Sequence, residues 1–77
     1  MLEKILEIIS ERTNIPLSAI NESTNLLELD IDSLDIINIV MDVEFSFNVR
    51  FDDEEIVDLR TPLDIEEIIR RKFAKNI

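Results

Sequence analysis

The residue whose chemistry stands out in this sequence is Ser33, which lies between Asp32 and Asp35 at the start of a long apolar helical pattern. A serine hydroxyl is a weak nucleophile without an adjacent general base. The chain contains no His and no Cys, so the commonest partners of a reactive hydroxyl are missing. Taken locally, Ser33 is most simply interpreted as a capping residue. The alternative is a side chain presented to another enzyme.

Two groups of carboxylates could bind cations. Asp30 and Asp32 have the alternating spacing of a calcium loop, but the required Gly is missing and the closing position holds Met41. The acidic run at 52–55 is better explained as a solvated helix start that the helix dipole favours. We therefore predict no metal site. Without His, Cys or a Gly-rich phosphate loop, an enzyme that acts alone is also not expected.

The charge of the chain limits its partners. Its formal net charge of −10 opposes binding to nucleic acid and to anionic membranes, and fits a protein partner with a basic patch. Residues 22–58 contain twelve of the eighteen acidic residues and one base, Arg50. Glu3 and Glu7 interrupt the first apolar pattern, so no signal peptide is expected. These features predict a monomeric, soluble, cytoplasmic protein without stable membrane insertion. The charge reverses near the end of the chain, at Arg70, Arg71, Lys72 and Lys75.

Helical periodicity predicts a single all-α domain over residues 1–77, a small bundle of three main helices plus one short helix. The first helix is expected from Leu2 to about Arg12, followed by a long loop over 13–31 that is rich in turn-forming residues. A loop of this length in a small domain is usually functional or held to the core. Six apolar loop residues could hold it there: Ile15, Leu17, Ile20, Leu26, Leu27 and Leu29.

The remaining helices have clear start signals. Asp32 with Asp35 three residues later resembles a capping box, which predicts a helix from near Asp32 to Phe47. A short helix is expected over 52–58. Thr61 followed by Pro62 predicts the start of the last helix, which runs through Phe73 and ends in basic residues that complement its dipole.

The helix after Asp32 carries two apolar stripes, whose centres lie about 140° apart on a helical wheel. One stripe is an ordinary core face: Ile36, Ile39, Val40, Val43 and Phe47. The second stripe lies beside polar residues: Leu34, Ile37, Met41 and Phe45. Either neighbouring helices cover both stripes, or the second stripe is a docking surface for partners.

The stretch from Leu26 to Leu34, LLELDIDSL, resembles the acyl carrier protein family, whose attachment motif is Asp-Ser-Leu at the start of the second helix. The runs SLDIINIVMDVEF, FDDEEIVDL and TPLDIEEII are similar to the family's second, third and fourth helical segments. The resemblance covers essentially the whole chain. It assigns the motif to Asp32, Ser33 and Leu34.

The resemblance implies that 4′-phosphopantetheine is attached to Ser33 by a phosphopantetheinyl transferase using coenzyme A and magnesium. The thiol of this arm would hold an acyl group as a thioester for acyl ligases, synthases or transferases with basic docking patches. It also implies that an acyl chain can enter the interior between helices. The implied docking residues are Leu34, Asp35, Ile37, Met41, Glu44, Asp53 and Glu54, to which the helical wheel adds Phe45.

The sequence departs from the family pattern at several positions. Asp30 stands where the family usually has Gly, and Asp52 stands where Pro is common. Asn38 and Phe45 occupy two positions that are commonly acidic, so the docking face is more apolar and less acidic than usual. These departures predict a specialised carrier with a restricted set of partners.

Two alternatives to an acyl carrier stay open. An aminoacyl or peptidyl carrier would use the same Ser33, and the sequence does not distinguish the cargo, although high acidity and stand-alone length favour an acyl carrier of a dissociated system. A non-catalytic acidic interaction module would use the charge and the second stripe but would not need Ser33.

Overall fold

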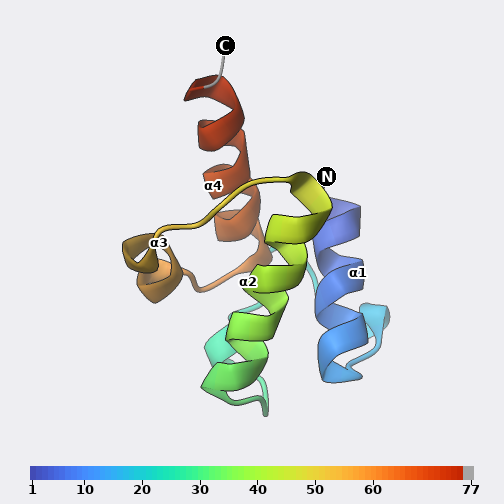
Figure 1. Cartoon of the computed structure of the whole chain (residues 1–77). Coiled ribbons are helices and arrows are strands. Elements are labelled where there is room, and N and C mark those ends of the chain that lie inside the picture. Colours follow the sequence, from blue (N-terminus) through green and yellow to red (C-terminus); the bar gives the residue numbers. More distant parts are fainter. Residues whose placement is uncertain (76–77) are drawn as a thin grey trace.

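Helix α1 (Leu2–Thr13) packs against both α2 (Ser33–Phe47) and α4 (Pro62–Lys75) in a computed structural model that describes residues 1–75 (Figure 1). The short helix α3 (Asp53–Asp58) lies in the connection between α2 and α4. The described residues form helices and loops without a β-strand. This confirms the predicted all-α bundle of three main helices and one short one.

The core is built from one face of each long helix. Residues at helical spacing on α1, α2 and α4 are buried, because a period of 3.6 residues gathers them on one side of each helix. Phe51 and Leu59, which flank α3, close the core from the side. Ile36 and Phe47, at the ends of the predicted core stripe, are partly buried and pack against this core. The buried residues of the long helices are Ile5, Ile8, Ile9, Ile39, Val40, Val43, Ile65, Ile68 and Ile69.

The chain has no glycine, so other residues begin and end its helices. Asn14 and Asn48 end α1 and α2 in the left-handed conformation, with φ of 61° and 54°. Asn tolerates this conformation better than most residues. At the start of α4, Thr61 Oγ1 accepts the Asp64 N–H at 3.2 Å and Asp64 Oδ2 accepts the Thr61 N–H at 3.0 Å. The predicted start at Thr61 and Pro62 is therefore confirmed.

The long loop contains two 3-10 turns, η1 (Leu17–Ala19) and η2 (Leu26–Glu28). Two backbone hydrogen bonds tie it to the start of α4: Leu26 N–H to Arg60 O at 2.7 Å, and Leu63 N–H to Glu22 O at 3.1 Å. These bonds hold the segment before α2 against the bundle.

Of the six apolar loop residues expected to hold the loop, Ile20 and Leu26 are buried. Ile15 and Leu29 pack against the core from its edge. Leu17 and Leu27 are exposed, so the prediction is wrong for these two. The reason is local, because a short 3-10 turn directs consecutive side chains to different sides.

Among the described residues, two ion pairs connect different helices. Arg12 on α1 contacts both carboxylate oxygens of Asp42 on α2, and this hydrogen bonding lowers the pKa of Asp42. Lys72 Nζ on α4 lies 2.8 Å from Glu55 Oε1 on α3. Partial burial tends to raise the pKa of Glu55. The hydrogen bond from the Asp52 N–H and the contacts with Lys72 outweigh it, so this pKa is lowered overall.

A pair of substitutions on α2 tests which stripe faces the core. Ile39 is 1% exposed and Ile37 is 46% exposed. We expect Ile39→Ala to lower the free energy of unfolding by about 2–5 kcal/mol, because it leaves a cavity. Ile37→Ala should cost less than about 1 kcal/mol. Urea denaturation of both variants measures this difference, and equal losses would contradict the orientation of α2.

The Glu55–Lys72 pair gives stability a pH dependence. Because its pKa is lower in the folded state, ionised Glu55 stabilises the fold above the ordinary Glu pKa of about 4.3. This contribution is lost as the pH falls through the folded-state pKa. Glu55→Gln should therefore destabilise the protein by up to about 1 kcal/mol at neutral pH. In urea denaturation the difference should shrink on acidification to about pH 3. A difference that is independent of pH would contradict this role.

Candidate functional site

The start of α2 is set by a reciprocal pair of hydrogen bonds between Asp32 and Asp35. Asp32 Oδ1 accepts the Asp35 N–H at 3.0 Å, and Asp35 Oδ2 accepts the Asp32 N–H at 3.2 Å. This is the capping box that the sequence predicted. It makes Asp32 the N-cap and places Ser33 at the first position of the helix.

Ser33 itself is exposed and is not the capping residue. Within residues 1–75, the Ser33 hydroxyl makes no hydrogen bond. The capping oxygen belongs to Asp32, which accepts the Asp35 N–H. The local interpretation of Ser33 as a capping serine is therefore wrong. The hydroxyl is free to be approached from solvent by another enzyme.

The turn before the motif explains how Asp30 replaces the usual Gly. The Ile31 N–H donates to Leu29 O at 2.8 Å across Asp30, which defines a γ-turn. Asp30 is not among the residues with positive φ, so this is the inverse form, which any L-residue can adopt. Asp30 therefore takes the place of the usual Gly without a positive φ.

An apolar cavity of about 320 Å³ opens beside Ser33, between the loop, α2 and α3. Asp32, Ser33 and Arg60 supply its polar rim. Its volume falls within the usual range of small-ligand sites. Its walls are mostly apolar side chains: Leu26, Leu27, Ile31, Ile36, Ile37, Ile56, Val57 and Leu59.

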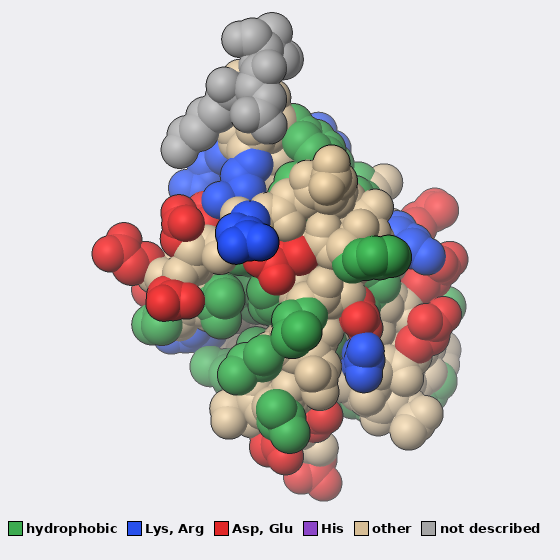
Figure 2. Space-filling model, viewed as in Figure 1, with side chains coloured by type: hydrophobic (Ala, Val, Ile, Leu, Met, Phe, Trp, Pro, Cys, Tyr) green, Lys and Arg blue, Asp and Glu red, His purple; other side chains and the backbone are tan. Residues whose placement is uncertain are grey.

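The second stripe of α2 faces solvent. Leu34, Met41 and Phe45 are 61%, 58% and 91% exposed. Figure 2 shows hydrophobic side chains gathered over the front of α2, with acidic side chains at the end where the helix begins. Of the two interpretations left open by the sequence, coverage of both stripes by neighbouring helices is wrong.

The acidic residues expected to flank this stripe differ in their exposure and in their hydrogen bonds within the protein. Asp53 and Glu54, in the first turn of α3, are exposed. Asp35 is held in the capping box. Glu44 Oε2 accepts the Phe51 N–H at 2.8 Å and so ties α2 to the segment after it. Sequence analysis missed this structural role, because the donor is a backbone N–H beyond the end of α2, where helical periodicity no longer applies.

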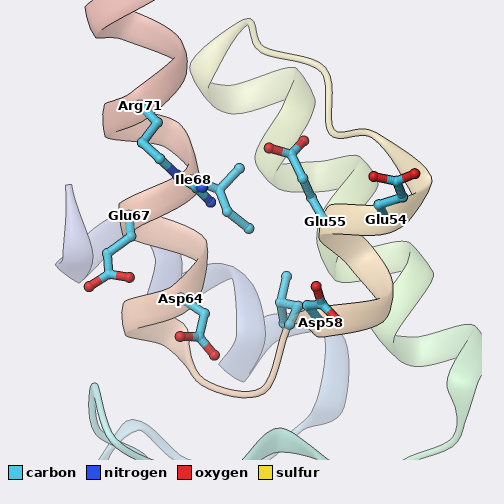
Figure 3. A pocket seen from close by; sticks show the side chains of 8 residues that line it. Glu54, Glu55, Asp58, Asp64, Glu67, Ile68 and Arg71 are labelled. Atoms are coloured by element: carbon cyan, nitrogen blue, oxygen red, sulfur yellow. The ribbon is translucent and has the colours of Figure 1, made fainter.

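A second cavity, of about 250 Å³, lies between α3 and α4 (Figure 3). Five carboxylates line it, and Arg71 extends toward Ile68 along its wall. Ser33 is not part of this cavity. Within residues 1–75, no group of three or more potential ligand side chains is arranged to hold a metal ion.

The chemistry of the Ser33 site suits a phosphodiester better than a reaction in place. The first N–H groups of a helix lack carbonyl partners and lie at its positive end, which favours a phosphate. In the described part of the chain, the N–H groups of Ser33 and Leu34 make no backbone hydrogen bond. The carboxylates of Asp32 and Asp35 oppose an anion. The site therefore accommodates a phosphate attached to Ser33 without providing strong affinity for a free one.

Comparison with known proteins agrees with this geometry. The family model for a phosphopantetheine attachment site matches residues 3–69. The chain is therefore of the class that bears phosphopantetheine on a serine.

The relatives narrow this class. The chain is 36% identical over 75 residues to an acyl carrier protein of Thermotoga maritima, covering 96% of this chain and 93% of the relative. It is 37% identical over 76 residues to an acyl carrier protein homolog of Mycoplasma genitalium, covering 97% and 90%. The crystal structure of the acyl carrier protein from Thermotoga maritima matches with a TM-score of 0.80 at 35% identity, over 97% of this chain and 88% of that one. The chain belongs to the acyl carrier protein family.

Within residues 1–75, each helix is too short or too polar to span a membrane.

Measurements of unfolding free energy can test whether Asp32 or Ser33 caps α2. Asp32→Ala removes the capping oxygen and should lower the free energy of unfolding by about 1 kcal/mol. Ser33→Ala removes an unbonded hydroxyl and should change it by less than about 0.5 kcal/mol. Urea denaturation checks both. A loss at Ser33→Ala as large as that at Asp32→Ala would make Ser33 a structural residue.

Proposed function

We propose that this chain is an acyl carrier protein that bears 4′-phosphopantetheine on Ser33 and delivers acyl thioesters to partner enzymes. The observation that carries the proposal is an exposed, unbonded serine hydroxyl at the first position of α2 in a chain of this family. The arm supplies a thiol that holds the acyl group as a thioester. The proposed role makes the chain a substrate of other enzymes and not itself a catalyst.

Attachment needs little from the chain beyond access to Ser33. The Ser33 oxygen forms a bond to the phosphorus that carries the pantetheine of coenzyme A, and the pyrophosphate bond breaks as the adenosine bisphosphate leaves. The transferase accepts the hydroxyl proton, which accounts for the lack of a base beside Ser33. The capping box holds the backbone of the motif while the side chain projects outward.

The apolar cavity beside Ser33 supports an acyl cargo. A hydrocarbon chain on the arm could leave water by entering between α2 and α3, where Ile36, Ile56 and Leu59 line the wall. A polar aminoacyl group would gain little there. We therefore favour an acyl carrier over an aminoacyl or peptidyl carrier. The relatives named as acyl carrier proteins point the same way.

The partners are proposed to be a phosphopantetheinyl transferase and acyl-handling enzymes with basic docking patches. The exposed second stripe offers them apolar contacts, while Asp35, Asp53 and Glu54 would steer basic surfaces and set the register. The acidic charge and the lack of a spanning helix in the described residues fit a cytoplasmic protein.

The attachment is tested by incubating the purified chain with coenzyme A, magnesium and a broad-specificity phosphopantetheinyl transferase, followed by intact mass measurement. The wild type should gain the mass of one phosphopantetheine group. Ser33→Ala should gain none, because its acceptor oxygen is missing. The matched control Ser18→Ala, which removes another exposed serine, should gain it as the wild type does.

Three other outcomes would each point to a different function or site. A folded wild type that gains no mass with several transferases would favour the acidic interaction module, which does not need Ser33. A gain in Ser33→Ala would move the attachment to another residue. After attachment, loading with an aminoacyl group but no acyl group would favour the peptidyl-type carrier.

A further inference from the structure

The C-terminal half of the second stripe exposes large apolar side chains that attachment of an arm to Ser33 does not require. Phe45 is 91% exposed, the highest value among the large hydrophobic side chains of the described residues. Met41, one turn earlier on the same stripe, is 58% exposed. An aromatic side chain offers a partner more apolar area than most residues, and such side chains are enriched among the residues that dominate binding.

The charge beside Phe45 differs from that of the rest of the face. Arg50 is the one base in residues 22–58, and it is exposed. Within residues 1–75, none of the ion pairs involves Arg50. Glu44 is close enough to line the same groove, but its Oε2 accepts the Phe51 N–H. Arg50 therefore presents a positive charge on an otherwise acidic stretch of chain.

Phe45 and Arg50 meet at one shallow groove of about 450 Å³, where α2 ends and the chain turns toward α3. The left-handed conformation of Asn48 makes this turn and brings the segment after α2 back to the helix. The groove is lined by Met41, Glu44, Phe45, Asn48, Val49 and Arg50.

The docking face is therefore polarised along α2. Asp32 and Asp35 lie at the start of α2, the middle of its exposed face is apolar, and Arg50 follows three residues after its end. A rise of 1.5 Å per residue puts Phe45 about 18 Å from Ser33 along the helix axis. A partner complementary to this face needs positive charge near Ser33 and negative charge beside the groove that Phe45 and Arg50 line.

Charge also decides between classes of occupant. An anionic membrane or a nucleic acid would be repelled by a chain of net charge −10. A second copy would bring two such charges together. A protein surface with both signs of charge matches the polarity of the face.

We propose that the partner enzyme of this carrier receives Phe45 in an apolar recess and pairs a carboxylate at the edge of that recess with Arg50. This inference rests on the proposed function, since it names the chemistry of the partner of the same carrier. Phe45 supplies most of the binding free energy. Arg50 supplies selectivity, because a uniformly basic patch on a wrong partner would repel its guanidinium group.

The experiment starts from the full chain with the photoreactive substitution Phe45→p-benzoylphenylalanine, crosslinked in the cells of origin. The adduct is identified by mass spectrometry, and the captured protein is then purified and titrated with the carrier. We expect Phe45→Ala to weaken this binding about 30-fold or more. Arg50→Glu should weaken it about tenfold or more. The matched controls Leu17→Ala and Lys4→Glu, which change an exposed apolar residue and an exposed base elsewhere, should bind within about twofold of the wild type.

A charge swap tests whether Arg50 pairs with a carboxylate of the captured protein. An Asp or Glu near the crosslinked site of that protein is changed to Arg. This variant should bind the wild-type carrier weakly and bind Arg50→Glu tightly. Four outcomes would overturn the inference: no protein adduct from position 45, adducts only with lipid or with a second copy, binding by Phe45→Ala equal to that of the wild type, or no rescue by any swap.

Failure of this inference can be separated from failure of the proposed function. If the wild type accepts phosphopantetheine but the substitutions at Phe45 and Arg50 leave binding unchanged, the carrier role stands and the partner chemistry is wrong. If the swap succeeds but Ser33 is never modified, the surface is a docking site of an interaction module. The substitution Phe45→Ala should not change the unfolding midpoint, since the side chain is exposed.

Discussion

The rotation of α2 about its axis is the constraint on which the rest of the structure depends. Ile39, Val40 and Val43 are buried in the core, and α2 packs against α1. A helix with two apolar stripes about 140° apart can bury only one of them here. Burying the first stripe turns the second outward, and the capping box at Asp32 fixes where the helix begins. The exposure of Ser33 and the exposure of the second stripe both follow from how α2 begins and packs.

This arrangement separates three tasks along a single helix. The first turn exposes the hydroxyl of Ser33, the inner face packs in the core, and the outer face exposes the apolar side chains that the proposed docking would use. In the proposed function, none of these tasks needs a general base or a metal ion on this chain. The chemistry would reside in the arm on Ser33 and in the partner enzymes, while the fold supplies position, a cavity beside Ser33 and an exposed apolar face.

Local signals in the sequence predicted most of the fold and the position of the motif. The capping box at Asp32, the Thr61–Pro62 start and the periodicity of α2 each depend on neighbouring residues, so they can be read without a structure. The sequence missed two features for different reasons. The tie from Glu44 to Phe51 joins a side chain of α2 to a backbone N–H beyond the end of that helix, so helical periodicity does not predict it. Leu17 and Leu27 are exposed because short 3-10 turns direct consecutive side chains to different sides. The resemblance to a family, more than the residues alone, assigned the role of Ser33.

The most direct test of the carrier role is the state of the protein in its own cells. Trypsin should release one peptide from Thr13 to Arg50, because no Lys or Arg lies between Arg12 and Arg50. Fragmentation of this peptide should place one phosphopantetheine group on Ser33 and leave its other serines unmodified. A peptide that carries the group on another serine, or that stays unmodified under every growth condition in which the protein is made, would contradict the account.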